Sequence, residues 1–120
     1  MITAEFAKQY SNEWIDAWNS HDLERILSHY TDDFTIESPM ALRLFPKSNG
    51  VIAGKNNVRN YWKLGLEKIP DLKFEIIDVL TGVNTLTIYY TNTATNRKTV
   101  EVMCFDRNKK VNKVIANYSE

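Results

Sequence analysis

The sequence contains a single cysteine, Cys104, among 120 residues. One thiol cannot form a disulfide within the chain, so a disulfide-stapled fold is excluded and the hydrophobic core must supply the stability. A surplus of one charge is also missing, because 15 Lys and Arg residues balance 15 Asp and Glu residues. Proteins that bind nucleic acids usually show a basic surplus or stripe. We therefore expect no nucleic-acid partner, and we interpret the basic run 107–110 as a turn between strands.

Long apolar runs and targeting signals are absent as well. No apolar stretch approaches the roughly 20 residues of a transmembrane helix, and residues 1–5 lack a basic segment leading into an apolar one. We therefore expect no membrane partner and a cytoplasmic location. The sequence has no HExxH motif or paired metal-ligand spacing and no cofactor signature, so we expect neither metal nor cofactor. Without repeats or linkers, residues 1–120 are expected to form one domain.

Three amphipathic segments predict three helices in the first part of the chain. The first helix carries an apolar, largely aromatic stripe with a period of four, formed by Ile2, Phe6, Tyr10, Trp14 and Trp18. Asp22 can cap a second helix, whose apolar stripe extends to Tyr30 and which residues 31–33 end. A third helix is expected over 56–68, and Pro70 prevents its continuation.

Five segments predict strands. A short strand, 34–38, ends at Pro39 and is followed by an expected loop over 40–53. The remaining strands form a meander over 72–80, 85–93, 98–105 and 111–118. The apolar phase slips between Ile76 and Ile77, which indicates a bulge that bends the sheet. Helices grouped before strands favour an α+β fold with an antiparallel sheet.

The strand 98–105 is apolar on both faces. Thr99, Glu101, Met103 and Phe105 share one face, while the other carries Val100, Val102 and Cys104. Helices can cover one face, and a second copy of the chain is the economical cover for the other. We therefore expect a homodimer formed through the outer face of the sheet.

Several short motifs, taken in this order, resemble the SnoaL-like, ketosteroid-isomerase-like branch of the nuclear transport factor 2-like superfamily. They are residues 22–26, 29–34, 36–39, Gly54, Tyr61-Trp62, Gly65-Leu66, 102–106 and 116–118. The resemblance covers nearly the whole chain. It implies a cystatin-like α+β fold, in which a cone-shaped, strongly curved mixed or antiparallel sheet holds three N-terminal helices on its concave face. The cone encloses a pocket, and dimers through the outer sheet face are common in the family.

The resemblance also carries implications for the site. In the steroid isomerases the general base is an aspartate just before the proline that ends the first strand. Here that proline is Pro39, and the position before it is Ser38. The isomerases' oxyanion tyrosine on the first helix corresponds to Trp14, and their second oxyanion donor corresponds to Glu101. In ketosteroid isomerase, that acid stays protonated in an apolar site. The loss of base and tyrosine argues against steroid isomerisation. SnoaL-type cyclases rely on one late-strand carboxylate, a role open to Glu101.

Glu101 is therefore the candidate catalytic residue. A carboxylate on an apolar inward face is costly to ionise, and a pKa raised toward neutrality suits an acid–base catalyst. The alternatives are an ion pair with Arg97 or Lys98, or a solvated position at the edge of the sheet.

An aromatic pocket is expected around Glu101. We expect its ligand, a small apolar or aromatic molecule, to contact Trp14, Tyr30, Ser38, Trp62, Met103 and Tyr118. Ser38 has the alternative of simply closing its strand before Pro39.

Two functional hypotheses follow. The first is an isomerase, cyclase or dehydratase that acts on an apolar, enolisable substrate through the single carboxylate of Glu101. The second is a ligand-binding or protein-interaction module of the same fold without chemistry. The serine at position 38 favours the second hypothesis, and the inward acid at position 101 favours the first.

Overall fold

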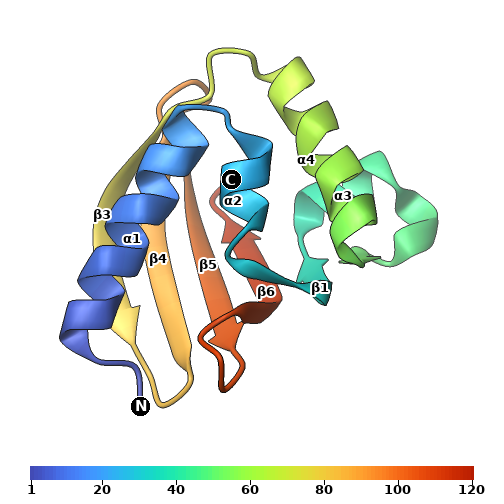
Figure 1. Cartoon of the computed structure of the whole chain (residues 1–120). Helices are drawn as coiled ribbons and strands as arrows, with labels where there is room; N and C mark the ends of the chain where they lie inside the picture. Colours follow the sequence, from blue (N-terminus) through green and yellow to red (C-terminus); the bar gives the residue numbers. More distant parts are fainter.

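A computed structural model describes residues 1–120 as an α+β fold of helices packed on one six-stranded sheet (Figure 1). In chain order the elements are α1 (Ala4–Asn19), α2 (Leu23–Leu27), β1 (Tyr30–Glu37), α3 (Pro39–Leu44), the 3-10 helix η1 (Pro46–Ser48), β2 (Val51–Ala53), α4 (Lys55–Lys68), β3 (Phe74–Thr81), β4 (Thr85–Asn92), β5 (Arg97–Phe105) and β6 (Val111–Tyr118).

The strand order of the sheet is β2-β1-β6-β5-β4-β3. β1 and β6 pair in parallel, and all other neighbours pair antiparallel, so the sheet is mixed. β5 lies in the interior of the sheet between β4 and β6. The predicted α+β class with a curved sheet under helices is therefore confirmed, and the strand that carries Glu101 is not an edge strand.

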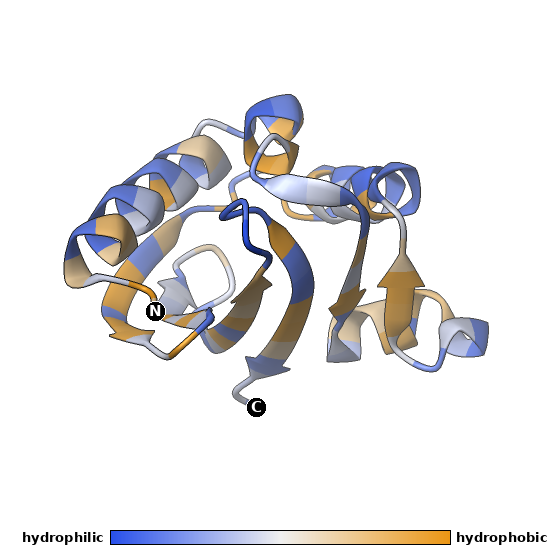
Figure 2. Cartoon of the chain, turned by 60° about the horizontal axis from the view of Figure 1, so that its bottom comes forward, coloured by the Kyte–Doolittle hydropathy of each residue, from blue (hydrophilic) through white to orange (hydrophobic).

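The first helix follows the predicted pattern. Thr3 caps α1 by accepting a hydrogen bond from the Phe6 amide at 3.0 Å, and the aromatic stripe of Tyr10, Trp14 and Trp18 is buried. Figure 2 shows α1 lying across the hollow of the bent sheet. With 16 residues in α1, none of the helices combines the length and the apolar character needed to cross a bilayer.

The end of α1 is fixed to the sheet by one asparagine. Asn19 accepts a hydrogen bond from the Phe74 amide at 2.8 Å and donates its Nδ2 hydrogen to the Phe74 carbonyl at 3.0 Å. This pair anchors the helix at the start of β3, and it brings Trp18 against the Phe74 ring at 5.4 Å between centroids. The contact between Trp18 and Phe74 forms one wall of the space enclosed between α1 and the sheet.

The predicted bulge is present in β3. The register between β3 and β4 shifts between Ile76 and Asp78, and the intervening Ile77 is exposed. Such a bulge increases local twist and bends the strand. The bend lets the sheet curve around the helices (Figure 2).

Two sequence predictions about local structure are wrong. Tyr30 was expected on the second helix, but α2 ends at Leu27 and Tyr30 begins β1. The Val111 amide donates to the His29 carbonyl at 2.9 Å, so pairing with β6 overrides the helical periodicity. The expected loop over 40–53 contains α3 and β2 instead, because Ser38 caps α3 and β2 pairs with β1.

Candidate functional site

A cavity of about 330 Å³ opens between the concave face of the sheet and helices α1, α3 and α4. Its lining is mostly apolar and aromatic, and its polar groups are few. The size falls within the range of small-molecule sites, toward its lower end. The aromatic wall is made by Trp18, Tyr61, Trp62, Phe74, Tyr90 and Tyr118.

Glu101 is the one carboxylate in the lining of this cavity. Its side chain is buried, with 5% of the residue exposed, because β5 is an interior strand and position 101 faces the helices. Glu101 forms no ion pair, although Arg97 and Lys98 lie on the same strand. The two structural alternatives, an ion pair with these residues and a solvated sheet edge, therefore do not describe this carboxylate.

Tyr90 holds one oxygen of the carboxylate. Its hydroxyl donates to Glu101 Oε2 at 2.5 Å across the β4–β5 pair. Burial raises the pKa of Glu101 from 4.5 to about 7, and the hydrogen bond from Tyr90 offsets part of that rise. Because Oε1 makes no hydrogen bond within the protein, it is the oxygen left available to a ligand in the cavity.

Ser38 lies behind the cavity lining, where it joins two phenols. Its Oγ is 3.0 Å from the Tyr61 hydroxyl and 3.2 Å from the Tyr118 hydroxyl, and it accepts from the amides of Met40 and Ala41. A hydroxyl has one hydrogen and two lone pairs. With one lone pair used by the Met40 amide, Ser38 can accept a hydrogen from only one of the two phenols. The hydrogen of the other phenol can be directed to its neighbouring phenol or to a ligand.

Both phenols remain neutral donors. Burial is the main cause that raises the pKa of Tyr61 and of Tyr118 above 10, and the electrostatic effect of Glu101 adds to it. The cavity therefore offers a carboxylate that can take or give a proton and, on the wall formed by α4 and β6, phenolic hydrogen-bond donors.

The predicted ligand contacts divide into two groups. Trp62 and Tyr118 line the cavity, and Ser38 supports the wall through the Tyr61 and Tyr118 hydroxyls. Trp14, Tyr30 and Met103 are not among the lining residues, and all three are buried in the core. Trp14 stacks on Phe74 with ring centroids 5.6 Å apart, and Tyr30 packs on Phe34 at 4.6 Å.

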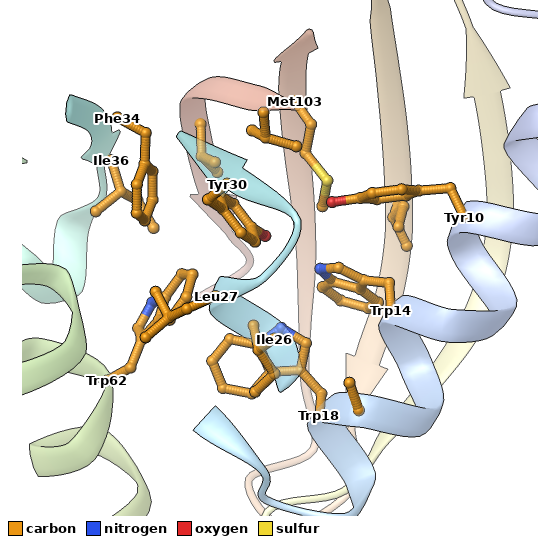
Figure 3. Close-up of a cluster of buried hydrophobic side chains, with 14 of the residues drawn as sticks. Tyr10, Trp14, Trp18, Ile26, Leu27, Tyr30, Phe34, Ile36, Trp62 and Met103 are labelled. Carbon is orange, nitrogen blue, oxygen red and sulfur yellow. The ribbon is translucent and has the colours of Figure 1, made fainter. Parts of the chain in front are cut away.

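The covered aromatic residues carry polar tips. The hydroxyls of Tyr10 and Tyr30 and the indole Nε1 of Trp14 are buried without a hydrogen-bond partner. Figure 3 shows these three tips directed toward the same interior region, between α1 and the start of β1. Burial and the nearby Glu101 raise the pKa of Tyr30, so its hydroxyl stays protonated. The deep end of the cone is thus aromatic and also rich in donors.

Comparison with known proteins identifies the family. A sequence model of the SnoaL-like domain matches residues 12–116. A SnoaL-like protein of unknown function from Burkholderia thailandensis E264 is 45% identical, with 99% of this chain and 98% of that chain covered and a TM-score of 0.94. The chain belongs to the SnoaL-like domain family.

More distant structures share the fold of this SnoaL-like domain. An NTF2-like protein of unknown function from Burkholderia xenovorans LB400 is 22% identical, with a TM-score of 0.75 and coverage of 100% of this chain and 88% of that chain. A proposed SnoaL-like polyketide cyclase from Shewanella denitrificans OS-217 is 13% identical, with a TM-score of 0.71 and coverage of 94% and 90%. No curated protein matches the sequence.

Two functional groups of the SnoaL-like domain were missed by the sequence predictions. Tyr90 was not selected, although the alternation of β4 places Leu86, Ile88, Tyr90 and Asn92 on one buried face. Tyr61 was named only within the resemblance motif Tyr61-Trp62. For Tyr90 the signal was its inward position on the strand before the one that carries Glu101, but the pairing register that joins the two residues is not written in the sequence.

The histidines and the cysteine of the SnoaL-like domain lie away from the cavity. His21 Nε2 is 2.7 Å from the Leu72 carbonyl, and His29 Nε2 is 3.2 Å from Glu13 Oε2. Cys104 is half-buried on the opposite face of β5 from Glu101, as the alternation predicted. These groups have structural surroundings and no contact with the carboxylate.

Proposed function

We propose that this SnoaL-like domain transfers a proton on an apolar, enolisable carbonyl compound, with Glu101 as the acid–base group. One observation carries the proposal: a buried carboxylate whose pKa is about 7 lines an aromatic cavity and forms no ion pair. A pKa near the working pH makes both protonation states available, which is the requirement for general acid–base catalysis.

The chemistry assigned to each group follows from its contacts. Ionised Glu101 takes a proton from the carbon next to the substrate carbonyl through Oε1, while Tyr90 keeps the carboxylate oriented through Oε2. Negative charge then grows on the carbonyl oxygen, and a phenol hydrogen of Tyr61 or Tyr118 stabilises it. Return of the proton to another carbon completes an isomerisation, and an internal carbonyl that accepts the carbanion leads to cyclisation.

Proton exchange provides a direct test that does not require the natural substrate. In D2O, the wild-type protein is expected to accelerate loss of the methyl proton signal of the neutral ketone 4-acetylbiphenyl. Glu101→Gln removes the acid–base group with little change in shape, so the rate should fall about 100-fold or more. Glu75→Gln, which changes an exposed carboxylate on β3, should retain the wild-type rate. Equal rates for wild type and Glu101→Gln would overturn the proposal.

A second candidate function is ligand binding without chemistry. The observation that favours it is the absence of a second carboxylate from the cavity lining, where Ser38 supports the wall with its hydroxyl and caps α3. This function predicts that 4-acetylbiphenyl binds to wild type and to Glu101→Gln with similar affinity and that neither accelerates exchange. The exchange assay therefore separates the two functions.

A further inference from the structure

Two arginines line the same cavity as Glu101, and neither forms an ion pair. Arg43 lies on α3 and Arg97 begins β5, and no carboxylate pairs with either guanidinium. By contrast, Arg25 is 2.6 Å from Glu13 and Arg59 is 2.8 Å from Glu24. Arg25 and Arg59 thus stabilise the protein's own carboxylates, whereas Arg43 and Arg97 have no carboxylate partner.

Arg97 stands on the same wall as the catalytic candidate. Positions 97, 99 and 101 alternate on one face of β5, and all three residues line the cavity. Four residues of extended strand span about 13 Å, so the charge of Arg97 and the carboxylate of Glu101 begin at opposite ends of this wall. Arg97 also lies over the ring of Tyr118, with its central carbon 6.0 Å from the ring centroid. This contact holds the guanidinium beside the cavity.

Arg43 supplies the second cation from a different element. It is exposed, whereas Arg97 is half-buried, so the positive charge lies toward the solvent end of the cavity. The deep end holds the buried Glu101, which is neutral for part of the time at neutral pH. Neutral polar residues, Asn92 and Thr95, line the cavity near the start of β5. The cavity is therefore polarised: its body is apolar, its inner end carries an acid, and its mouth carries unpaired guanidinium groups.

We propose that the ligand of this cavity is an amphipathic carboxylic acid: a flat apolar body whose carboxylate is bound by Arg97 and Arg43. A guanidinium matches the planar geometry of a carboxylate and can donate two parallel hydrogen bonds. The enolisable carbonyl lies at the other end of the ligand, where it reaches Glu101. That last assignment rests on the proposed function, but recognition of the carboxylate does not.

A matched pair of compounds tests the proposal. The compound 4'-acetylbiphenyl-4-carboxylate has an anionic group at one end and a methyl ketone at the other, and its primary amide has the same shape without the charge. Calorimetric titration of the wild-type protein should show the carboxylate binding about tenfold more tightly than the amide, with the preference reduced at high salt. Equal affinities, or no binding of either compound, would overturn the assignment.

Variants then identify the groups responsible. Arg97→Gln should remove most of the preference, and the double variant with Arg43→Gln should bind the two compounds equally. Arg107→Gln, which changes an exposed arginine in the turn after β5, should keep the tenfold preference. Neither Arg43 nor Arg97 forms an ion pair, so the variants should fold normally, which circular dichroism checks. A preference that survives in the double variant would contradict the proposal.

The failure of this inference can be distinguished from failure of the proposed function. Glu101→Gln should lose proton exchange on neutral 4-acetylbiphenyl and still prefer the carboxylate to the amide. If exchange fails while the preference persists, the anion site stands and the acid–base role falls. If exchange is present and the two compounds bind equally, the acid–base role stands and the anion site falls.

Discussion

Tyr90 on β4 and Glu101 on β5 share a hydrogen bond of 2.5 Å in the interior of the sheet, and it is the one hydrogen bond that the carboxylate receives from the protein. The two residues are diagonal neighbours, because Tyr90 pairs with Thr99 while Glu101 pairs with Ile88. The phenol stabilises the ionised carboxylate, and burial opposes ionisation more strongly. Their balance sets the pKa of the group near neutrality.

Removing this hydrogen bond should raise the pKa of Glu101 further. Tyr90→Phe withdraws a donor that favours the charged form, and the burial that favours the neutral form remains. The pH at which proton exchange reaches half its maximum should therefore move upward. Tyr89→Phe is the matched control, because Tyr89 lies on the other face of the same strand. A downward shift in Tyr90→Phe, or the same shift in both variants, would contradict this account.

The raised pKa of Glu101 also makes folding stability depend on pH. The folded state holds the proton up to about pH 7, whereas the unfolded state releases it near 4.5, so the wild type loses stability as pH rises through this window. Above the window the loss is about 3 kcal/mol, and it is absent below 4.5. Glu101→Gln lacks this dependence. Urea unfolding should show the variant gaining on the wild type between pH 4.5 and about 7, while Glu75→Gln runs parallel to the wild type.

Ser38 should contribute to stability through its contacts with α3 and two phenols. Ser38→Ala removes the cap of α3 and leaves the Tyr61 and Tyr118 hydroxyls without their protein partner. We expect the free energy of unfolding to fall by about 1–2 kcal/mol. Ser28→Ala, at an exposed serine whose hydroxyl bonds only to the Arg25 carbonyl, should change the free energy of unfolding much less. Similar losses in the two variants would show that the contacts of Ser38 with α3 and the two phenols contribute no more to the free energy of unfolding than the single hydroxyl hydrogen bond of Ser28.

The outer face of the sheet leads us to propose a homodimer. Val100, Val102 and Ile115 are half-buried on that face in the isolated chain, and Leu80 on β3 is 53% exposed. Sedimentation should show a dimer for the wild type and a monomer for Val102→Lys. Val83→Lys, at an exposed turn, should remain dimeric. A wild-type protein that sediments as a monomer at every concentration would exclude this interface.

The sequence predicted the features that depend on local periodicity. The aromatic stripe of α1, the bulge beside Ile77 and the inward direction of Glu101 follow from periods of four and two, and the structure has all three. Tyr30 was misplaced, because its segment continues a helical pattern until pairing with β6 takes over. The strand conformation of Tyr30 depends on its pairing with Val111, a partner more than 80 residues away in the chain.

The candidate site was less accessible to sequence reasoning than the fold. Of the residues expected to contact a ligand, Trp62 and Tyr118 line the cavity, whereas Trp14 and Met103 are buried in the core outside its lining. Which inward side chain borders empty space depends on the sizes of all the others, and no local pattern records it. Arg43 joins the mouth through α3, a six-residue helix that was expected to be loop.

The titration of Glu101 near neutrality, in a cavity that a ligand can enter, can be measured by carbon-13 NMR of the protein labelled at glutamate carboxyl carbons. The Glu101 signal is assigned by its absence from Glu101→Gln. We expect a midpoint close to 7, well separated from those of the exposed glutamates, and a change in that midpoint when 4-acetylbiphenyl is added. A midpoint near 4.5 that the ketone leaves unchanged would contradict this expectation.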